Sequence, residues 1–196
     1  ADQASNFAKA IAGDFNPLHD PDNRRFCVPG DLLFTALLQQ YGISQAMHFR
    51  FSGMVGANVT LHLEEKPGDA YELCDAAGKT YLHVDRSGKV AHDSQMIEHL
   101  ARSYVAFSGQ NFPHILLPLM QDQGVMINTE RPMVIYESMD FKLKRLDIPG
   151  VKLRLVDSRM QVDGKRGDVR LTFEFLCGEM VVGTGCKRLL LSGLRP

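Results

Sequence analysis

Long apolar runs and an excess of charge of either sign are both missing from this chain of 196 residues. Its 22 basic and 23 acidic residues nearly cancel, so charge does not favour a nucleic acid or an acidic membrane surface as a partner. The longest apolar runs are far too short to span a membrane, and the sequence shows no basic-then-apolar leader. We therefore expect a cytoplasmic protein with no membrane span and no nucleic-acid partner.

Short motifs of several enzyme classes are missing too. The chain has no G-x-x-x-x-G-K-[ST] phosphate loop, no G-x-S-x-G elbow and no H-E-x-x-H pair, so nucleotide hydrolysis, serine-hydrolase chemistry and a zinc protease site have no support. One group of residues could suggest a metal site: His92, Asp93, Glu98 and His99. Its histidines are seven residues apart, which is two helical turns rather than one, so we interpret the group as solvated helix surface. We expect no metal and no cofactor.

The cysteines show no C-x-x-C spacing, and nothing else in the chain suggests secretion. We therefore expect small buried side chains rather than a disulfide framework at the four positions, which are Cys27, Cys74, Cys177 and Cys186.

Two periodicities alternate along the chain. Apolar residues fall all around a helix over residues 32–38, which is typical of a helix enclosed by other structure. Asp31 is suited to cap its start, and Gly42 is suited to end it. From Val59 onward the period becomes 2, which predicts strands through Asp85, with a turn at Ser87-Gly88. A helix over Ile97 to Phe107 and an apolar helix over residues 115–120 follow. Strands are then expected over residues 133–136, 141–145, 151–156, 160–162, 168–176 and 179–191, the last two forming a hairpin around residues 177–178.

The second half repeats the order of the first. Gly13 and Pro17 recur as Gly109 and Pro113, both 96 residues later (109 − 13 and 113 − 17). Equally, Gly42 and the Pro-Gly pair at residues 67–68 recur as Gly124 and the pair at residues 149–150, both 82 residues later (124 − 42 and 149 − 67). Fixed offsets in the same element order favour a duplication, with units at 1–92 and 93–196. In the second copy Gln110 replaces Asp14, and His114 lies one residue too early to match His19, which indicates a degenerate half.

The candidate site lies at residues 13–19, Gly-Asp-Phe-Asn-Pro-Leu-His. It holds Asp14 and His19 five residues apart on a segment bent by Asn16 and Pro17, so a carboxylate and an imidazole can act on one water from two directions. Ordinary turn chemistry is the alternative, with the Asp and Asn side chains accepting from local backbone N–H groups.

A short helix, this loop, an enclosed helix and an antiparallel sheet together resemble the hotdog fold of the MaoC-like dehydratases, which include the (R)-specific enoyl-CoA hydratases. The resemblance covers residues 7–38 and the Glu-Lys-Pro-Gly-Asp turn at residues 65–69. Two such units imply an α+β double hotdog: two antiparallel sheets side by side, each wrapping a central apolar helix. One chain would then be a pseudo-dimer that can pair further.

The resemblance also implies an activity. Asp14 and His19 would hold the water that adds to a trans-2-enoyl thioester of coenzyme A or acyl carrier protein, while Gly13 and Asn16 shape the loop. Backbone N–H groups at the start of the enclosed helix would hold the enolate oxygen. There this chain has Gly30-Asp31 in place of the family's usual His-Gly, and an Asp31 cap would compete for those N–H groups.

Two other functions stay open. One is a hotdog acyl-CoA thioesterase in which Asp14 or Asp31 activates water against the thioester carbonyl. The other is a non-catalytic acyl-thioester-binding protein. Arg24 and Arg25 could lie near the phosphates of coenzyme A. Lys187 and Arg188 allow either that same role or a place on an exposed sheet face.

Overall fold

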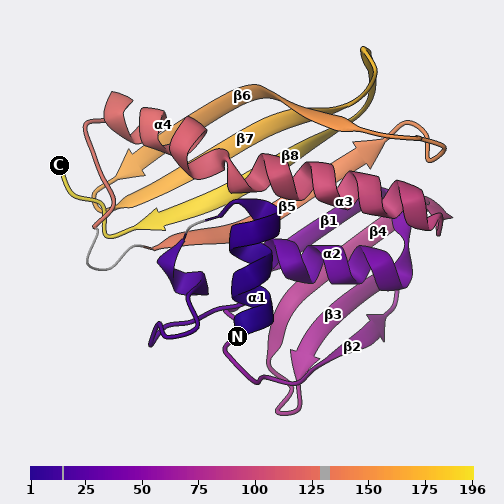
Figure 1. The fold of residues 1–196 in the computed structure, drawn as a ribbon, viewed down its shortest axis with the longest axis horizontal. Coiled ribbons are helices and arrows are strands. Elements are labelled where there is room, and N and C mark those ends of the chain that lie inside the picture. Colours follow the sequence, from indigo (N-terminus) through magenta and orange to yellow (C-terminus); the bar gives the residue numbers. More distant parts are fainter. Residues whose placement is uncertain (15, 129–132) are drawn as a thin grey trace.

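The strands form a single antiparallel sheet in the order β2-β3-β4-β1-β5-β8-β7-β6. The computed structural model describes residues 1–14, 16–128 and 133–196, and Figure 1 shows the helices gathered on one face of the sheet. In the first half the elements are α1 (Asp2–Asn6), the π-helical η1 (Phe7–Ala12), the 3-10 turn η2 (Pro17–His19), α2 (Gly30–Tyr41), β1 (Ile43–Phe51), β2 (Leu61–Lys66), β3 (Ala70–Asp75) and β4 (Thr80–Ala91). In the second half they are α3 (Ser94–Gly109), the π-helical η3 (Phe112–Leu116), α4 (Leu117–Asp122), β5 (Val134–Leu143), β6 (Lys152–Asp163), β7 (Arg166–Cys177) and β8 (Met180–Ser192).

The two sheets expected side by side are continuous and form one sheet, because β1 joins the halves. It pairs with β4 on one side and with β5 on the other, where Met47 lies opposite Phe141. Sequence reasoning had overlooked β1 altogether. Outward from this seam the strands run β1-β4-β3-β2 in one direction and β5-β8-β7-β6 in the other. The two halves thus share one strand order, as a duplicated unit would, and the division at residues 92 and 93 stays a prediction.

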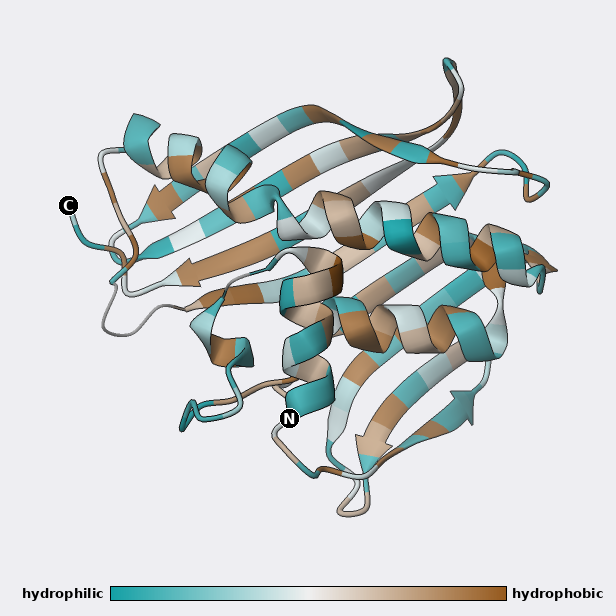
Figure 2. Cartoon of the chain, viewed as in Figure 1, coloured by the Kyte–Doolittle hydropathy of each residue, from teal (hydrophilic) through white to brown (hydrophobic). Residues whose placement is uncertain are grey.

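The long helices α2 and α3 lie side by side across the sheet (Figure 1). They share one core with the inner faces of the strands, in which Phe34 of α2 packs against Phe49 of β1 and against Tyr104 of α3. Figure 2 shows the matching alternation of hydrophobic and hydrophilic residues along the strands. The helix over residues 115–120, expected to match α2, belongs instead to a smaller cluster in which Leu116 and Met120 pack with β7 and β8. The partner of α2 is therefore α3.

Several expected breaks in the strands are absent from the structure. Residues 133–145 were expected to form two strands, but β5 is continuous, and the same holds for β6. The turn expected at Ser87-Gly88 is a bulge inside β4, where Gly88 has φ +85° and the register shifts beside Gln45 of β1. The side-chain oxygen of Gln45 accepts the N–H of Lys89 at 3.0 Å, so the extra residue is held without breaking the ladder.

All four cysteines are free thiols, and Cys27 and Cys74 are buried as expected, whereas Cys177 and Cys186 are only half-buried. Across the described parts of the chain, every helix is too short or too polar to cross a membrane.

Candidate active site

The loop that carries Asp14 begins where η1 ends. Gly13 takes the left-handed conformation, with φ +68°, and the N–H of Asp14 donates to the carbonyl of Ala8 at 2.8 Å. One carboxylate oxygen of Asp14, Oδ1, accepts the N–H of Asn16 at 2.9 Å, and Oδ1 of Asn16 caps η2 by accepting the N–H of Leu18 at 3.1 Å. Turn chemistry thus accounts for Asn16 and for one oxygen of Asp14, and it leaves Oδ2 of Asp14 available.

His19 lies at the end of η2 and turns back toward that second oxygen. The side chain is only 8% exposed, and its Nδ1 donates to the carbonyl of Cys27 at 2.8 Å, which fixes the ring. Its Nε2 lies 3.5 Å from Oδ2 of Asp14, whose side chain is about one-third exposed. The two side chains chosen from the sequence therefore face each other, with the carboxylate on the solvent side.

The charges of this pair reinforce one another. Burial disfavours the charged imidazole, but the hydrogen bond to Asp14 and the contacts with Cys27 outweigh it and raise the pKa of His19 to about 10. Burial also acts against the Asp14 carboxylate, yet His19, the N–H of Asn16 and the charge of Lys187 hold the pKa of Asp14 below its ordinary value. At neutral pH the pair is a carboxylate facing an imidazolium, which is a base beside an acid.

Next to this pair lies the start of α2. A Cβ at Gly30 would lie 2.9 Å from Cδ1 of Tyr136 and 3.1 Å from Cε1 of Phe51, so the packed rings leave room only for glycine. The first N–H groups of a helix have no acceptor within it, so this end of α2 offers donors to a developing negative charge.

Asp31 does not cap α2, contrary to the sequence-based expectation. It is the second residue of the helix, the residue at the cap position is Pro29, and no side chain caps this end. The Asp31 carboxyl is buried, its Oδ1 has no hydrogen-bond partner among the described residues, and that oxygen lies 4.0 Å from Nζ of Lys187. The carboxyl is thus turned toward the sheet rather than onto the N–H groups of α2.

Lys187 is the residue of this site that sequence reasoning left undecided. Its side chain is buried, its ammonium donates to the hydroxyl of Ser108, and it lies 4.0 Å from the centre of the Tyr136 ring. The available signal was the alternation of β8, in which residues 185, 187, 189 and 191 all face the core. Arg188, the next residue, points to the other face and pairs with Asp168 at 2.6 Å.

The corresponding segment of the second half has a different structure. Gln110 and His114 are both exposed at the end of α3 and in η3. Gly109 packs so closely on η1 that a Cβ there would lie 1.6 Å from the carbonyl oxygen of Ala12. The second copy therefore supports the loop of the first copy through its backbone, and its own Gln110 and His114 do not form an equivalent pair.

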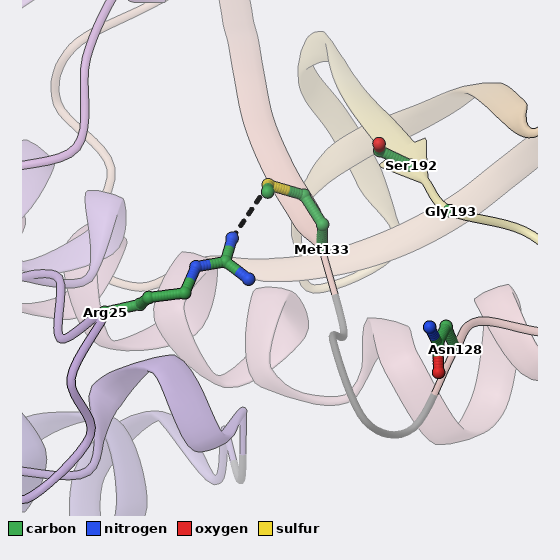
Figure 3. Close-up of a pocket in the computed structure, with 5 residues that line it drawn as sticks. All are labelled: Arg25, Asn128, Met133, Ser192 and Gly193. Atoms are coloured by element: carbon green, nitrogen blue, oxygen red, sulfur yellow. Dashed lines mark hydrogen bonds between the residues drawn. The ribbon is translucent and has the colours of Figure 1, made fainter.

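A cavity of about 400 Å³ lies near the strand ends, lined by Arg25, Asn128, Met133, Ser192 and Gly193 (Figure 3). Arg25 belongs to the segment between His19 and α2, and its guanidinium donates to Sδ of Met133 at 3.5 Å. The cavity thus offers a positive charge and polar groups close in sequence to the loop of the candidate site.

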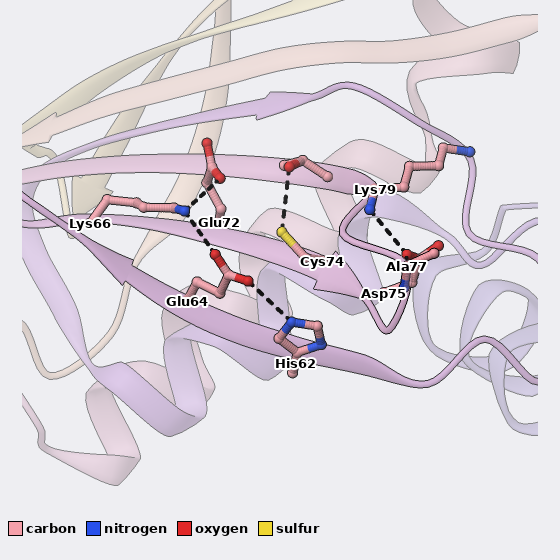
Figure 4. Close-up of polar contacts among 9 residues, drawn as sticks. His62, Glu64, Lys66, Glu72, Cys74, Asp75, Ala77 and Lys79 are labelled. Carbon is pink, nitrogen blue, oxygen red and sulfur yellow. Dashed lines mark hydrogen bonds and ion pairs between the residues drawn. The ribbon is translucent and has the colours of Figure 1, made fainter.

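Possible metal ligands gather on the outer face of β2 and β3. Ligand atoms of Glu64, Glu72 and Cys74 lie within 4.8 Å of one another. However, Nζ of Lys66 lies between the two carboxylates, 2.7 Å from Glu64 and 3.2 Å from Glu72, as Figure 4 shows. The ammonium bridges the two carboxylates, and His62 and His83 each contact one of them, so this group forms an ion-pair network.

The other group considered for a metal is dispersed. Asp93 caps the start of α3, Glu98 pairs with Arg102 on the surface, and Nδ1 of His99 donates to the carbonyl of Pro149 at 2.9 Å. These contacts agree with the interpretation as helix surface.

Comparison with known proteins identifies a family and a fold. The family model described as "Protein of unknown function (DUF3581)" matches residues 1–196. No curated protein matches the chain. Among solved structures, the tesB protein of Mycobacterium avium subs paratuberculosis is 10% identical, with 91% of each chain covered and a TM-score of 0.51.

Two further solved structures are similar at lower scores. The acyl-CoA thioesterase II TesB2 of Mycobacterium marinum is 9% identical, with 84% of this chain and 89% of that chain covered and a TM-score of 0.46. A Chloroflexus aurantiacus protein whose description names a MaoC domain dehydratase is 9% identical, with 98% and 92% covered and a TM-score of 0.49. At 10% identity the likeness to the tesB protein shows the fold alone, which is a double hotdog.

Proposed function

The chain belongs to the DUF3581 family, and we propose that this member adds water to, or removes it from, a trans-2-enoyl thioester, with Asp14 and His19 as the catalytic residues. One observation carries the proposal: a carboxylate and an imidazolium face each other, with Oδ2 of Asp14 3.5 Å from Nε2 of His19, and the carboxylate is reachable from solvent. This geometry supports a base and an acid acting on the two ends of one double bond.

In the hydration direction, Oδ2 of Asp14 takes a proton from water while the water oxygen bonds to the β-carbon. The electron pair of the double bond moves toward the thioester oxygen and forms an enolate, and Nε2 of His19 then donates its proton to the α-carbon. Once Asp14 is neutral, the charge that raised the pKa of His19 is gone, so the imidazolium becomes a stronger acid at the moment it is needed. Transfer of the proton from Asp14 to His19 restores the starting pair.

The enolate oxygen needs hydrogen-bond donors, and the start of α2 supplies the candidates. The N–H groups of Gly30 and Asp31 belong to the first turn of a helix of 12 residues, where the helix dipole favours negative charge. The orientation of the Asp31 carboxyl, away from these groups and toward Lys187, supports this assignment.

The carrier of the acyl group is proposed to be anionic, as coenzyme A and acyl carrier protein both are. The cavity lined by Arg25 supports this, because a guanidinium binds phosphate with a fixed charge and paired donors.

The experiment is to incubate the protein with crotonyl-CoA and longer enoyl-CoAs, following the absorbance of the conjugated double bond and the release of free thiol in parallel. We expect the absorbance to fall without thiol release, and Asp14→Asn to abolish this change. Asp20→Asn is the matched control, because Asp20 directly follows the loop and its carboxylate pairs with Lys9. Intact enoyl-CoAs, or hydration that survives in Asp14→Asn, would overturn the proposal.

A thioesterase is the second candidate, favoured by one observation: Oδ1 of Asp31 is a buried acceptor without a hydrogen-bond partner among the described residues, at the end of α2 that would bind the thioester oxygen. A carboxylate there could take a proton from a water attacking the carbonyl carbon. Release of free thiol in the same assay, lost in Asp31→Asn, would identify this reaction. Binding of acyl-CoA with neither change would identify a binding protein.

A further inference from the structure

Lys187 extends from β8 into the space between the sheet and the two long helices. It contacts Ser108 at the end of α3 through a hydrogen bond and lies over the Tyr136 ring of β5. Across from it, on α2, is Asp31, at 4.0 Å. A buried ammonium is costly unless opposite charge and acceptors compensate it, so a lysine at this core position needs an explanation.

The spacing of Lys187 and Asp31 is unusual for a purely structural ion pair. Buried ammonium and carboxylate groups that stabilise a fold normally close to hydrogen-bond distance, about 2.7–2.9 Å. Here the gap is 4.0 Å, and Oδ1 of Asp31 lacks a hydrogen-bond partner within the described ranges. Burial lowers the pKa of Lys187, while the charges of Asp31 and, more weakly, of Asp14 act to keep its ammonium protonated. The ammonium in turn favours the carboxylate form of Asp14, in addition to the larger influence of His19.

We propose that Lys187 is the positioning residue of this site: through its charge it offsets the buried carboxyl of Asp31 at the start of α2, and it adds to the stronger influence of His19 that keeps Asp14 a carboxylate. The catalytic part of this role rests on the proposed function. The role also explains how Gly30-Asp31 can replace the His-Gly that is usual in the MaoC-like dehydratases. An acidic residue at the start of α2 is tolerated because the opposite charge comes from a strand of the other half.

The groups around Lys187 fix the order in which the site takes up protons. Burial raises the pKa of Asp31, whereas the pKa of Asp14 is held low, so acidification protonates Asp31 first. Lys187 is then left without its counter-charge, and its field acts on Asp14 alone. The remaining titratable groups that face it, the hydroxyls of Tyr104 and Tyr136, stay neutral because burial raises the pKa of both well above the ordinary value. His19, the last member, is already positive.

Two variants isolate this effect. The single variant Asp31→Asn keeps the lysine and removes its counter-charge. The double variant Asp31→Asn with Lys187→Met removes both charges. Neither variant leaves an unpaired carboxylate buried at position 31. In both, the carboxyl carbon of Asp14 is titrated by NMR in protein labelled at aspartate, with Asp14→Asn identifying the signal.

We expect the midpoint for Asp14 to stay low in Asp31→Asn and to move to higher pH in the double variant. The acid limb of the pH profile of enoyl-CoA hydration should move with it. Equal midpoints in the two folded variants would overturn the role of Lys187. The NMR readout needs no substrate, so a shifted midpoint in a protein that does not hydrate enoyl-CoAs would refute the proposed function and leave the electrostatic role of Lys187 standing.

Discussion

Nζ of Lys187 lies 4.0 Å from Oδ1 of Asp31, and the two residues come from opposite halves of the chain. Asp31 is the second residue of α2, the helix that precedes the first four strands, and Lys187 is in β8, the last strand in the sequence. Their approach depends on the central pairing of β1 with β5 and of β5 with β8, which brings the second half's strands under the first half's helix. The proposed catalytic pair in the loop beside them is thus supported by both halves.

Replacing the imidazole should remove the general acid. We expect His19→Gln to lower kcat/KM for enoyl-CoA hydration by about 10²- to 10⁴-fold, the usual contribution of a positioned acid or base. The assay is the initial rate of loss of the enoyl absorbance. His114→Gln serves as the control, because that residue is exposed in η3 and should leave the rate unchanged. A rate in His19→Gln equal to that of the control would exclude His19 from the reaction.

The stability of the protein should depend on pH through His19. Its pKa is raised from 6.5 to about 10 in the folded protein, so the folded state binds the proton more tightly than the unfolded chain does. The resulting stabilisation is fully present below pH 6.5 and is lost as the pH rises toward 10. We expect the difference in free energy of unfolding between the wild type and His19→Gln, measured by urea denaturation, to shrink over that interval. A difference that grows with pH would show that the imidazole is buried in its neutral form.

Packing at the start of α2 should tolerate no side chain at residue 30. Gly30→Ala puts a methyl group 2.9 Å from Cδ1 of Tyr136, and we expect a loss of about 1–3 kcal/mol in the free energy of unfolding, as for other overpacked cores. Gly150→Ala is the matched control, since a Cβ there meets nothing within 4 Å. Equal urea midpoints for the two variants would show that the rings of Tyr136 and Phe51 yield to the methyl group without cost.

The carrier end of the substrate should depend on Arg25. Because its guanidinium lines the cavity, Arg25→Ala is expected to raise KM for enoyl-CoA substrates while kcat changes little. The effect should vanish with the corresponding enoyl-pantetheine thioester, which lacks the charged nucleotide end. Arg102→Ala, which removes a surface arginine paired with Glu98, should change neither constant. If KM rose equally with both substrates, Arg25 would not act on the phosphates of the carrier.

The sequence predicted correctly those helices and turns that neighbouring residues are sufficient to specify. The helix α2 and its end at Gly42 were confirmed, because the apolar run and the glycine, with φ +81°, are written into consecutive residues. The hairpin of β7 and β8 at residues 177–178 was confirmed for the same reason. By contrast β1 was overlooked, although Met47 and Phe49 alternate with His48 and Arg50, and its omission hid the seam that joins the halves. The expectation that other structure encloses α2 was wrong, because the sheet and α3 cover only one side of it: residues 34, 37 and 38 are buried, whereas residues 36, 39 and 40 are exposed.

The sequence by itself therefore determined an α+β chain of the hotdog type, with Asp14 and His19 in one short loop, because a bend at Asn16 and Pro17 is a local property of the backbone. Only the tertiary structure decided what Asp31 does. A helix cap and a buried carboxyl facing a lysine are equally compatible with the same residues around position 31. The choice was made by Lys187, whose position across the sheet follows from strand pairing and not from any neighbouring residue.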